Sequence, residues 1–383
     1  MLSIPLQIAL LVPVVGGSVL SAFCVVAAHK TMRRPHIADR SFRPPVTVLK
    51  PIYGVDKGLE ANLRSLCEQD YPDYQIVMSV QRTDDPALAI LHRLAAEYPT
   101  HVTLVIEQSE PVVNGKVQNL VNALAAARHG ILIISDSDVR LQPDYLSQII
   151  PPLADPEVGY VCTLYRAVAA DRWYEKMELL SINADFVPGV ILSYWSGIAS
   201  FCLGASVAFR RRDLDAVGGM AALGDYLVED YELGRRLLAL GKRMILVPEP
   251  VEILVGFPDA HRWWHHQIYW DQNTKAAHPV GFFLTILTRA MPFAVLYAIA
   301  RQFDAVGSVV LAAAAVWRVA AAAVIAAYLG DREGLRTLWL LPIRDLLAVT
   351  SWCIALSKRS FVWRGHRFGL THAGRIVPRE RVS

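Results

Sequence analysis

The sequence predicts an α/β domain with a mostly parallel sheet and with hydrophobic helices near both ends of the chain. Of its 383 residues, 54% are hydrophobic and only 19% are charged, and the mean hydropathy is +0.31. The apolar excess is concentrated near the two ends, whereas in the middle short apolar runs alternate with stretches of helical length. Because an ordinary soluble domain carries about 25% charged residues, this composition excludes a disordered, collagen-like or wholly soluble protein.

The first hydrophobic stretch, residues 4–28, contains no charged side chain and is long enough to cross a bilayer as a helix. No Lys or Arg precedes it, whereas Lys30, Arg33 and Arg34 follow it. A cleaved signal peptide has the opposite charge pattern, and basic residues favour the cytoplasmic side of a membrane. We therefore expect residues 1–29 to form an N-terminal transmembrane anchor, with the chain after it in the cytoplasm.

Residues 45–256 are predicted to form one cytoplasmic α/β domain. Its first predicted strands are 46–50, 75–81, 102–107 and 131–135, and the helices between them are 58–69, 86–98 and 116–129. Such alternation is typical of a mostly parallel sheet that is covered on both faces and binds its ligands beyond the carboxyl ends of the strands. No GxGxxG or GxxxxGK[ST] pattern is present, which argues against dinucleotide-binding and P-loop sites.

Carboxylates directly follow two of these predicted strands. Asp85 comes after the second strand, and Asp136-Ser137-Asp138 comes after the fourth. Residues two apart in extended backbone point to the same side, so Asp136 and Asp138 are expected to face one ligand together. Two neighbouring carboxylates suit a hard divalent cation, and Mg²⁺ is typically bound by one or two carboxylates together with substrate phosphates. A lone Asp-x-Asp is also common in solvated turns, so the position after a buried strand carries the prediction.

A further acidic pair, Glu229-Asp230, opens the predicted helix 229–241. Acidic residues in a first helical turn stabilise the helix by complementing its dipole. The local pattern therefore indicates a helix start as readily as a functional site.

The remaining composition favours a membrane protein with no nucleic-acid partner. The formal net charge is only +3, and no basic stripe with interleaved aromatic residues is present. The five cysteines are widely spaced and include no CxxC pair, which indicates neither a disulfide framework nor a zinc site.

Three further apolar runs follow in the last third of the chain, at 280–300, 305–329 and 337–357. Three full crossings would place the basic residues after them outside the cytoplasm, so we expect one run to re-enter or to lie in the interface. The stretch before them contains Trp263, Trp264 and Trp270, which is typical of a membrane-interface belt. We therefore predict an interfacial segment at 257–279, membrane segments within 280–357, and a basic cytoplasmic tail at 358–383.

With these residues identified, the chain resembles the ceramide glucosyltransferase family, membrane-bound relatives of the family-2 glycosyltransferases with the GT-A fold. The matching stretches are VTVLKPIYGVD (46–56), EQDYPDYQIVMSVQRTDDPA (68–87), GKVQNL (115–120), SDSDVR (135–140), GASVAFRRRDLDAVGG (204–219), VEDYELG (228–234), IRD (343–345) and WRGHRFGL (363–370). Their order and spacing run along nearly the whole chain, which makes a chance match very improbable.

The resemblance implies a role for each matched position. It places the nucleotide-sugar contacts at Lys50, Pro51, Asp85, Lys116, Asp136 and Trp270, the metal ligands at Asp136 and Asp138, and the catalytic base at Asp230. It also suggests acceptor contacts at Gly204, Ser206 and Glu229. The implied cofactor is Mg²⁺ or Mn²⁺, which would hold the diphosphate of a UDP-sugar.

One family motif departs from its usual form. The family ends its catalytic domain with (Q/R)xxRW, whereas the aligned stretch here is His266-Gln267-Ile268-Tyr269-Trp270, which keeps only the Trp. A competing register ends at Trp263 and has Asp259 in the first position. The loss of the Arg leaves open how the leaving diphosphate is held and which sugar and acceptor are used.

The resemblance implies an inverting transferase that moves a sugar, with glucose as the family default, from a UDP-sugar to a lipid hydroxyl, with ceramide expected as the acceptor. Diacylglycerol or a hopanoid-type polyol stays open as the acceptor, and a processive polysaccharide synthase or an inactive membrane scaffold stays open as the function. The expected location is integral to a membrane with the catalytic domain cytoplasmic. The Ala-rich composition favours a bacterial inner membrane.

Overall fold

A computed structural model describes residues 3–33, 41–107, 112–198, 201–358, 360–363, 366–371 and 374–381. The chain forms two compact units, each described here by itself. The sheet unit comprises Pro35–Tyr165, Ser200–Gly256 and Ser360–Ser383, and the helical unit comprises Met1–Arg34, Arg166–Ala199 and Phe257–Arg359. Residues 166–199 lie inside the range predicted for the cytoplasmic domain but group with the helical unit, because their helices pack on helices from both ends of the chain.

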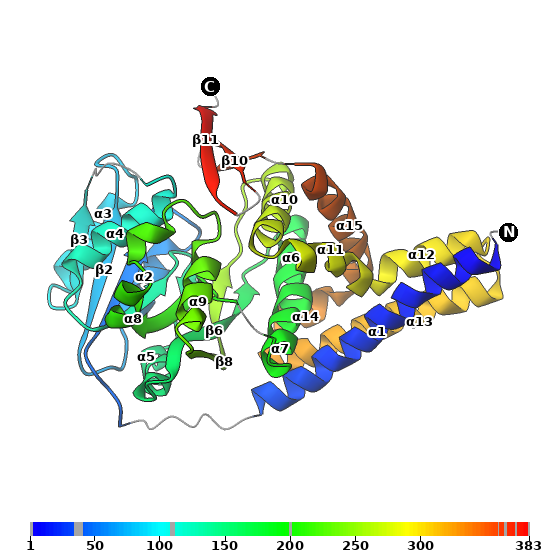
Figure 1. Ribbon diagram of the computed structural model, residues 1–383, viewed down its shortest axis with the longest axis horizontal. Coiled ribbons are helices and arrows are strands. Elements are labelled where there is room, and N and C mark those ends of the chain that lie inside the picture. Colours follow the sequence, from blue (N-terminus) through cyan, green and yellow to red (C-terminus); the bar gives the residue numbers. More distant parts are fainter. Residues whose placement is uncertain are drawn as a thin grey trace. The chain divides into compact units, whose positions relative to one another are not determined.

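The sheet unit is built on an eight-stranded mixed sheet in the order β3-β2-β1-β4-β7-β6-β8-β5. Figure 1 labels β2, β3, β6 and β8 of this sheet. Its strands are β1 (Val46–Pro51), β2 (Tyr74–Val80), β3 (Val102–Ile106), β4 (Ile131–Ser135), β5 (Val139–Arg140), β6 (Val158–Val168), β7 (Ser206–Arg210) and β8 (Arg243–Leu254). Strands β1 to β4 pair in parallel, whereas β7 runs antiparallel to both β4 and β6. The predicted α/β class is confirmed.

Helices cover the sheet because its central strands are apolar on both faces. Every residue of β1, β2 and β4 is buried, as expected for parallel strands between two helical layers. The helices of this unit are α2 (Leu59–Cys67), α3 (Leu88–Glu97), α4 (Gly115–Ala126), α5 (Tyr145–Ile149), α8 (Arg211–Ala216) and α9 (Glu229–Ala239), with 3₁₀ turns at Pro151–Ala154 and Met220–Leu223. The parallel register brings the carboxyl ends of β1 and β4 to one edge of the sheet.

The range predicted only as a basic tail contains a second sheet. Strands β9 (Ser360–Trp363), β10 (His366–Leu370) and β11 (Ile376–Arg381) form an antiparallel sheet in the order β11-β10-β9. Before β11, Gly374 has φ +72°, a left-handed backbone conformation that glycine adopts without a steric penalty. This sheet belongs to the sheet unit.

Among its described residues, the helical unit contains three helices that are long and apolar enough to cross a membrane: α1 (Ile4–Met32), α13 (Ala305–Leu329) and the stretch Arg332–Ser357. The last comprises α14 (Arg332–Thr337), a 3₁₀ turn (Leu338–Leu340) and α15 (Leu341–Ser357). The apolar run before α13 is bent by 49° between Pro279–Thr288 and Ala290–Ala300, which is the form of a broken span or a re-entrant loop. Its elements are α11 (Pro279–Leu284), a 3₁₀ turn (Thr285–Thr288) and α12 (Ala290–Ala300), and the unit also holds α6 (Trp173–Ser181), a π-helical turn (Ile182–Phe186), α7 (Val187–Trp195) and α10 (Ala260–Ala277).

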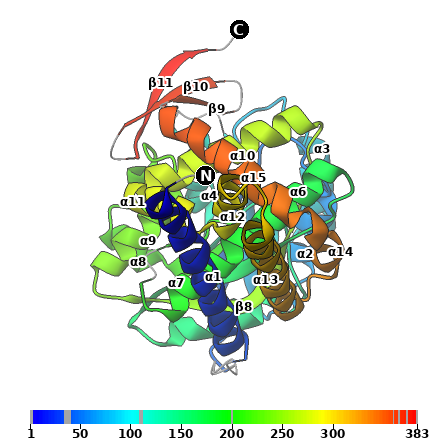
Figure 2. The ribbon, with the colours of Figure 1, turned by 90° about the vertical axis from the view of Figure 1, so that its right-hand side faces the viewer.

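Helix α1 packs closely on the bent segment and on α13 (Figure 2). A Cβ atom at Gly17 would lie 2.7 Å from the carbonyl oxygen of Thr288, so glycine permits this approach. Val14 of α1 packs with Met291, Ala294 and Ala314 in an apolar cluster. Segments far apart in the sequence therefore share one core.

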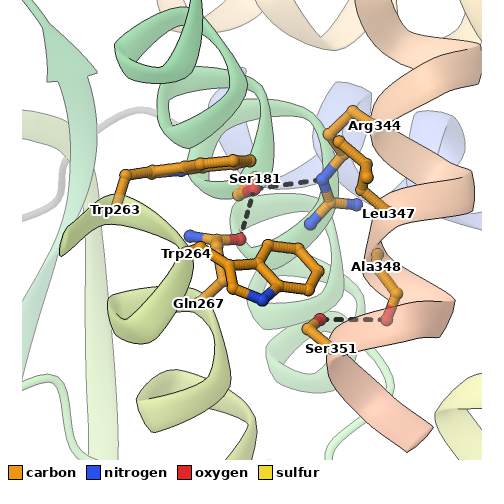
Figure 3. Close-up of a pocket in the computed structure, with 8 residues that line it drawn as sticks. All are labelled: Ser181, Trp263, Trp264, Gln267, Arg344, Leu347, Ala348 and Ser351. Atoms are coloured by element: carbon orange, nitrogen blue, oxygen red, sulfur yellow. Dashed lines mark hydrogen bonds between the residues drawn. The ribbon is translucent and has the colours of Figure 1, made fainter. Parts of the chain in front are cut away.

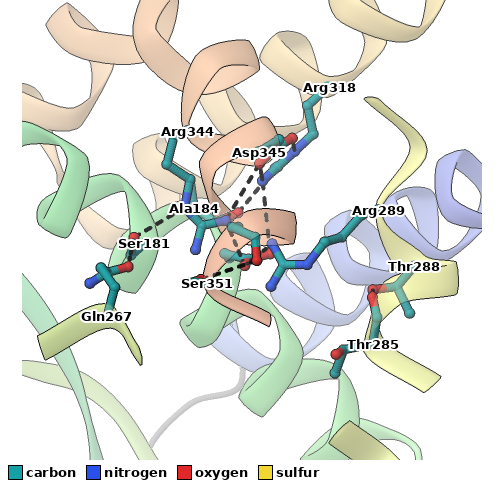
Figure 4. Close-up of polar contacts among 12 residues, drawn as sticks. Ser181, Ala184, Gln267, Thr285, Thr288, Arg289, Arg318, Arg344, Asp345 and Ser351 are labelled. Atoms are coloured by element: carbon teal, nitrogen blue, oxygen red, sulfur yellow. Dashed lines mark hydrogen bonds and ion pairs between the residues drawn. The ribbon is translucent and has the colours of Figure 1, made fainter. Parts of the chain in front are cut away.

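The ionisable residues inside the apolar runs are paired within the helical unit (Figure 4). Arg318 Nε lies 2.8 Å from Asp345 Oδ2, and Arg344 Nη1 lies 2.6 Å from Asp185 Oδ2. Arg289 Nη1 contacts the same Asp185 oxygen at 3.0 Å. Charges in membrane segments are costly unless they pair or face protein, so this network explains how the apolar runs contain three arginines.

A small, partly open pocket lies beside this network in the helical unit (Figure 3). Its lining comprises Ser181, Trp263, Trp264, Gln267, Arg344, Leu347, Ala348 and Ser351. Ser181 Oγ accepts a hydrogen bond from Arg344 Nε and donates one to Gln267 Oε1, each at 3.0 Å. The predicted interfacial segment is therefore tied to α6 and α15 by polar contacts.

Candidate functional site

Lys116 joins two of the acidic segments singled out from the sequence. It lies in the first turn of α4, and its Nζ atom is 2.7 Å from Oδ1 of Asp136 and 2.9 Å from Oε1 of Glu229. Burial alone would lower the pKa of Lys116, but the carboxylates of Asp136, Glu229 and Asp230 outweigh it and raise the pKa well above its usual value. The carboxyl end of β4 and the N-terminus of α9 are thus held around one permanent cation.

Asn114 connects the same elements, although the sequence analysis did not single it out. Its Oδ1 atom caps α4 by accepting hydrogen bonds from the backbone N–H groups of Lys116 and Val117. Its Nδ2 atom donates to the carbonyl of Tyr226 at 2.9 Å and to Oε2 of Glu229 at 3.3 Å. The signal that identifies it is an Asn immediately before a Gly-Lys helix start, since Asn is a preferred helix cap.

Asp136 and Asp138 follow β4 at the carboxyl edge of the sheet, as predicted. Burial, together with the charges of Asp136 and Asp56, raises the pKa of Asp138 to about 6. Asp56, from the loop after β1, accepts a hydrogen bond of 2.9 Å from Ser137 Oγ and was missed in the sequence analysis. These oxygens are the hard donors that Mg²⁺ or Mn²⁺ prefers, and two carboxylates leave coordination positions for substrate phosphates.

The Asp230 carboxylate is fixed by two backbone donors. Oδ2 accepts a hydrogen bond of 2.7 Å from the N–H of Gly204, and Oδ1 accepts one of 2.7 Å from the N–H of Tyr231. Burial and the neighbouring charge of Glu229 raise the pKa of Asp230 to about 7, against the opposing effect of Lys116. A half-buried carboxylate with a pKa near neutrality is suited to accept a proton.

Gly204 permits this arrangement by lacking a side chain. A Cβ atom at this position would lie 2.6 Å from Oδ2 of Asp230, which is too close for any real contact. Of the residues predicted to contact an acceptor, Gly204 and Glu229 therefore lie beside Asp230 and Lys116. Ser206 instead is fully buried in β7, with its hydroxyl 2.5 Å from that of Tyr145.

Lys50 and Asp85, two residues predicted to contact the nucleotide, form hydrogen bonds to other parts of the protein. The Lys50 side chain is fully buried, and its Nζ atom donates to Ser135 Oγ at 3.1 Å and to the carbonyl of Asp136. Burial lowers the pKa of Lys50 to about 8. It follows that Lys50, one residue before Pro51 at the end of β1, supports the end of β4 from inside the sheet.

Asp85 is likewise bound to backbone. Its two carboxylate oxygens accept from the N–H of Gly54 at 3.1 and 2.9 Å, and Oδ1 also accepts from the N–H of Ala87 at 2.9 Å. The carboxylate therefore holds the loop after β1 against the loop after β2, at the edge of the sheet where Asp136 lies.

Trp270 belongs to α10 in the helical unit. Its indole N–H donates to Nε2 of His266 at 3.0 Å, and its ring meets Phe186 edge-on at a centroid distance of 5.5 Å. These contacts explain the position of Trp270 within its own unit, and a contact with a nucleotide sugar stays a prediction.

The whole chain is similar to known glycosyltransferases. A family model described as Glycosyl transferase family 21 matches residues 12–376. Ceramide glucosyltransferases 1 and 3 of Caenorhabditis elegans are 26% and 24% identical over 257 and 258 residues, which is 64% of this chain and 55% of each relative. The ceramide glucosyltransferase of Komagataella phaffii is 33% identical over 114 residues, 28% of this chain and 22% of that protein. The match thus spans about half the length of the first two relatives.

A solved structure has a similar fold over nearly all of its length. It is the mannosyltransferase PcManGT from Pyrobaculum calidifontis, in complex with GDP-Man and Mn²⁺. The TM-score is 0.56 at 23% sequence identity, and the match covers 92% of this chain and 98% of that chain. This likeness confirms the predicted GT-A fold.

Proposed function

The chain belongs to glycosyl transferase family 21, and we propose that it is an inverting transferase that moves glucose from UDP-glucose to the hydroxyl of a membrane lipid, ceramide. One observation carries the proposal: Lys116 bridges Asp136 and Glu229 beside Asp230, a carboxylate whose pKa is raised to about 7. The site thereby combines charged groups for a nucleotide diphosphate with a base for an acceptor hydroxyl.

The donor half of the site uses residues at the carboxyl edge of the sheet. Asp136 and Asp138 would hold Mg²⁺ or Mn²⁺, which neutralises charge on the departing UDP when bound. Lys116 supplies a second positive charge at the same place and stays protonated, because the nearby carboxylates raise its pKa. Asp85 acts by holding the two loops that form the edge of the donor site.

The acceptor half uses Asp230. Its carboxylate takes the proton of the lipid hydroxyl while that oxygen forms a bond to the anomeric carbon of the sugar. The bond from the anomeric carbon to the UDP oxygen breaks in the same displacement, and UDP leaves with the electron pair. A single displacement inverts the anomeric centre, so an α-linked donor gives a β-glycoside.

The proposed location is a membrane, with the sheet unit on the cytoplasmic side. The support is the set of three apolar helices of sufficient length, together with the basic residues His29, Lys30 and Arg33 that end α1 and follow it. We propose a bacterial inner membrane from the Ala-rich composition of helices such as α13.

Product formation by the purified full chain in mixed lipid micelles tests the function. UDP-glucose, UDP-galactose, UDP-glucuronate and UDP-N-acetylglucosamine are each offered with ceramide, diacylglycerol or a hopanoid polyol, in Mn²⁺ or Mg²⁺. The proposal predicts a β-glucosylceramide that requires the metal. A glycolipid formed from a different UDP-sugar or a different lipid would correct the proposed donor or acceptor. A long polysaccharide product would identify a processive synthase. A protein that neither binds UDP nor turns over would favour an inactive scaffold.

The pH dependence of turnover follows from Asp230. Its pKa of about 7 lies above the usual carboxyl value, and only the deprotonated form accepts a proton. We therefore expect kcat/KM for the UDP-sugar to rise about tenfold per pH unit below pH 7 and to level off above it, because this ratio reports ionisation of the free enzyme. A rate that is constant from pH 5.5 to 8.5 would contradict this role.

Replacing Gly204 with alanine is expected to displace Asp230. The added Cβ would lie 2.6 Å from Oδ2 of Asp230, and a shift of about 1 Å in a reacting group can cost on the order of 100-fold in rate. We expect kcat to fall by one to two orders of magnitude, while UDP binding measured by calorimetry is unchanged. The control is Gly130→Ala, because a Cβ at Gly130 meets no atom within 4 Å. Equal kcat values for the two variants would contradict the proposal that a side chain at position 204 displaces Asp230.

A further inference from the structure

The two residues before β11, together with its first residue, pair with the loop that leads into α9. The backbone N–H of Leu227 donates to the carbonyl of Gly374 at 3.1 Å, and the N–H of Ile376 donates to the carbonyl of Asp225 at 2.7 Å. Between them, Tyr226 and Arg375 form an antiparallel bridge. We call residues 374–376 the C-terminal strap.

Side chains as well as backbone hydrogen bonds hold the strap against the loop that leads into α9. Two guanidinium groups lie over the Tyr226 ring, with the Arg375 carbon 5.4 Å and the Arg236 carbon 5.5 Å from its centroid. Cation–π contacts of this kind are each favourable. Ile376 is buried at 4% exposure, so the strap also has an apolar anchor.

The loop that the strap holds lies close to Asp230 and Glu229 in sequence and is joined to the Lys116 helix by hydrogen bonds through Asn114. Tyr226 lies three residues before Glu229 and four before Asp230. Its carbonyl accepts a hydrogen bond from Asn114 Nδ2, the atom that also donates to Glu229. Asn114 in turn caps the helix that carries Lys116, and its backbone N–H donates to the carbonyl of Gly224 at 2.8 Å.

We propose that the C-terminal strap is a positioning element of the active site, which sets the start of α9 and thereby the place of the Asp230 carboxylate. The strap follows α15 in the chain, so residues near 375 complete a site whose other parts lie between residues 50 and 230. This inference rests on the proposed function, because it assigns the strap to the acceptor half of that site.

Two variants of the full chain test the strap. Arg375→Gln removes the cation–π contact with Tyr226, and Gly374→Ala forces a side chain into a backbone conformation with φ +72°. Arg243→Gln is the control, because Arg243 is an exposed arginine of the same unit that pairs with Asp155. Each protein is assayed for glucosylceramide formation with UDP-glucose, ceramide and Mn²⁺, and hydrogen–deuterium exchange is followed in a peptide covering 224–230.

We expect both strap variants to exchange faster at 224–230 and to lose about tenfold in kcat, because small displacements of a reacting group are costly. The dissociation constant for UDP should stay within about twofold of wild type, because in the described part of the chain the strap contacts loop 225–227 directly but reaches Lys116 only through Asn114, and so mainly affects the base. The Arg243→Gln control should match wild type in both measurements.

Two results would overturn the proposal that the strap positions Asp230. One is a normal kcat in both strap variants, and the other is a loss that falls equally on kcat and on UDP affinity, as general unfolding would cause. A wild-type protein that makes no glycolipid would defeat the proposed function instead. In that case, hydrogen–deuterium exchange at 224–230 still tests whether the strap holds the loop. Exchange rates equal to wild type in both strap variants would show that it does not.

Discussion

Replacing Asp230 with asparagine is expected to lower kcat by ~10²–10⁴-fold, the range that a positioned general base contributes. Asparagine has nearly the shape of aspartate, and its amide oxygen accepts a hydrogen bond from the N–H of Gly204 or Tyr231 as the carboxylate does. What is lost is the ability to take a proton near pH 7, together with the acceptor for one of these two N–H groups. Glycolipid formation should therefore collapse, while UDP affinity stays close to wild type and the thermal unfolding temperature falls only slightly.

The matched control for this variant is Asp215→Asn. Asp215 lies on α8 of the same unit and is exposed, so the same chemical change there should leave kcat unchanged. A variant at Asp230 with normal kcat would exclude the residue as the base. A variant that instead unfolds at a lower temperature and loses UDP binding in parallel would indicate that the carboxylate only stabilises the start of α9.

The sheet and its carboxyl-edge aspartates could be predicted because their signals are local. Strands such as β2 and β4 are short apolar runs, and every residue in them is buried. A carboxylate placed directly after such a strand has little freedom in where it lies, so the position of Asp136 follows from the strand alone. The start of a helix at Glu229 could be predicted for the same reason, since its acidic first turn is a local pattern.

The contacts that assemble the site could not be predicted, because they join residues far apart in the chain. Asn114 and Glu229 are 115 residues apart, and neither carries a local signal for the other. Lys50 follows the family pattern, yet its neighbours in β4 bury it completely. The basic composition after residue 358 likewise gives no sign of the strands there, whose pairing depends on loop 225–227 and on each other.

The second large effect is expected at Asp136. Asp136→Asn removes one of the two carboxylates proposed to hold the cation and one of the two anionic partners of Lys116. Removing one preorganised electrostatic group costs on the order of 10²–10³-fold in rate, and the missing charge acts on both donor binding and leaving-group departure. We expect kcat/KM for the UDP-sugar to fall by that amount and Mn²⁺-dependent UDP binding to weaken, as measured by calorimetry with and without the metal.

A control and a double-mutant cycle make this prediction specific. Asp84→Asn changes a carboxylate that also follows a strand, but its side chain is 69% exposed and pairs with Arg82, so donor affinity should not change. In the cycle, Lys116→Met is combined with Asp136→Asn. Because Nζ and Oδ1 are 2.7 Å apart, the two losses in UDP affinity should not add, as is usual for groups in direct contact. Strict additivity, or a Mn²⁺ dependence that survives Asp136→Asn unchanged, would place the cation and the diphosphate away from this edge of the sheet.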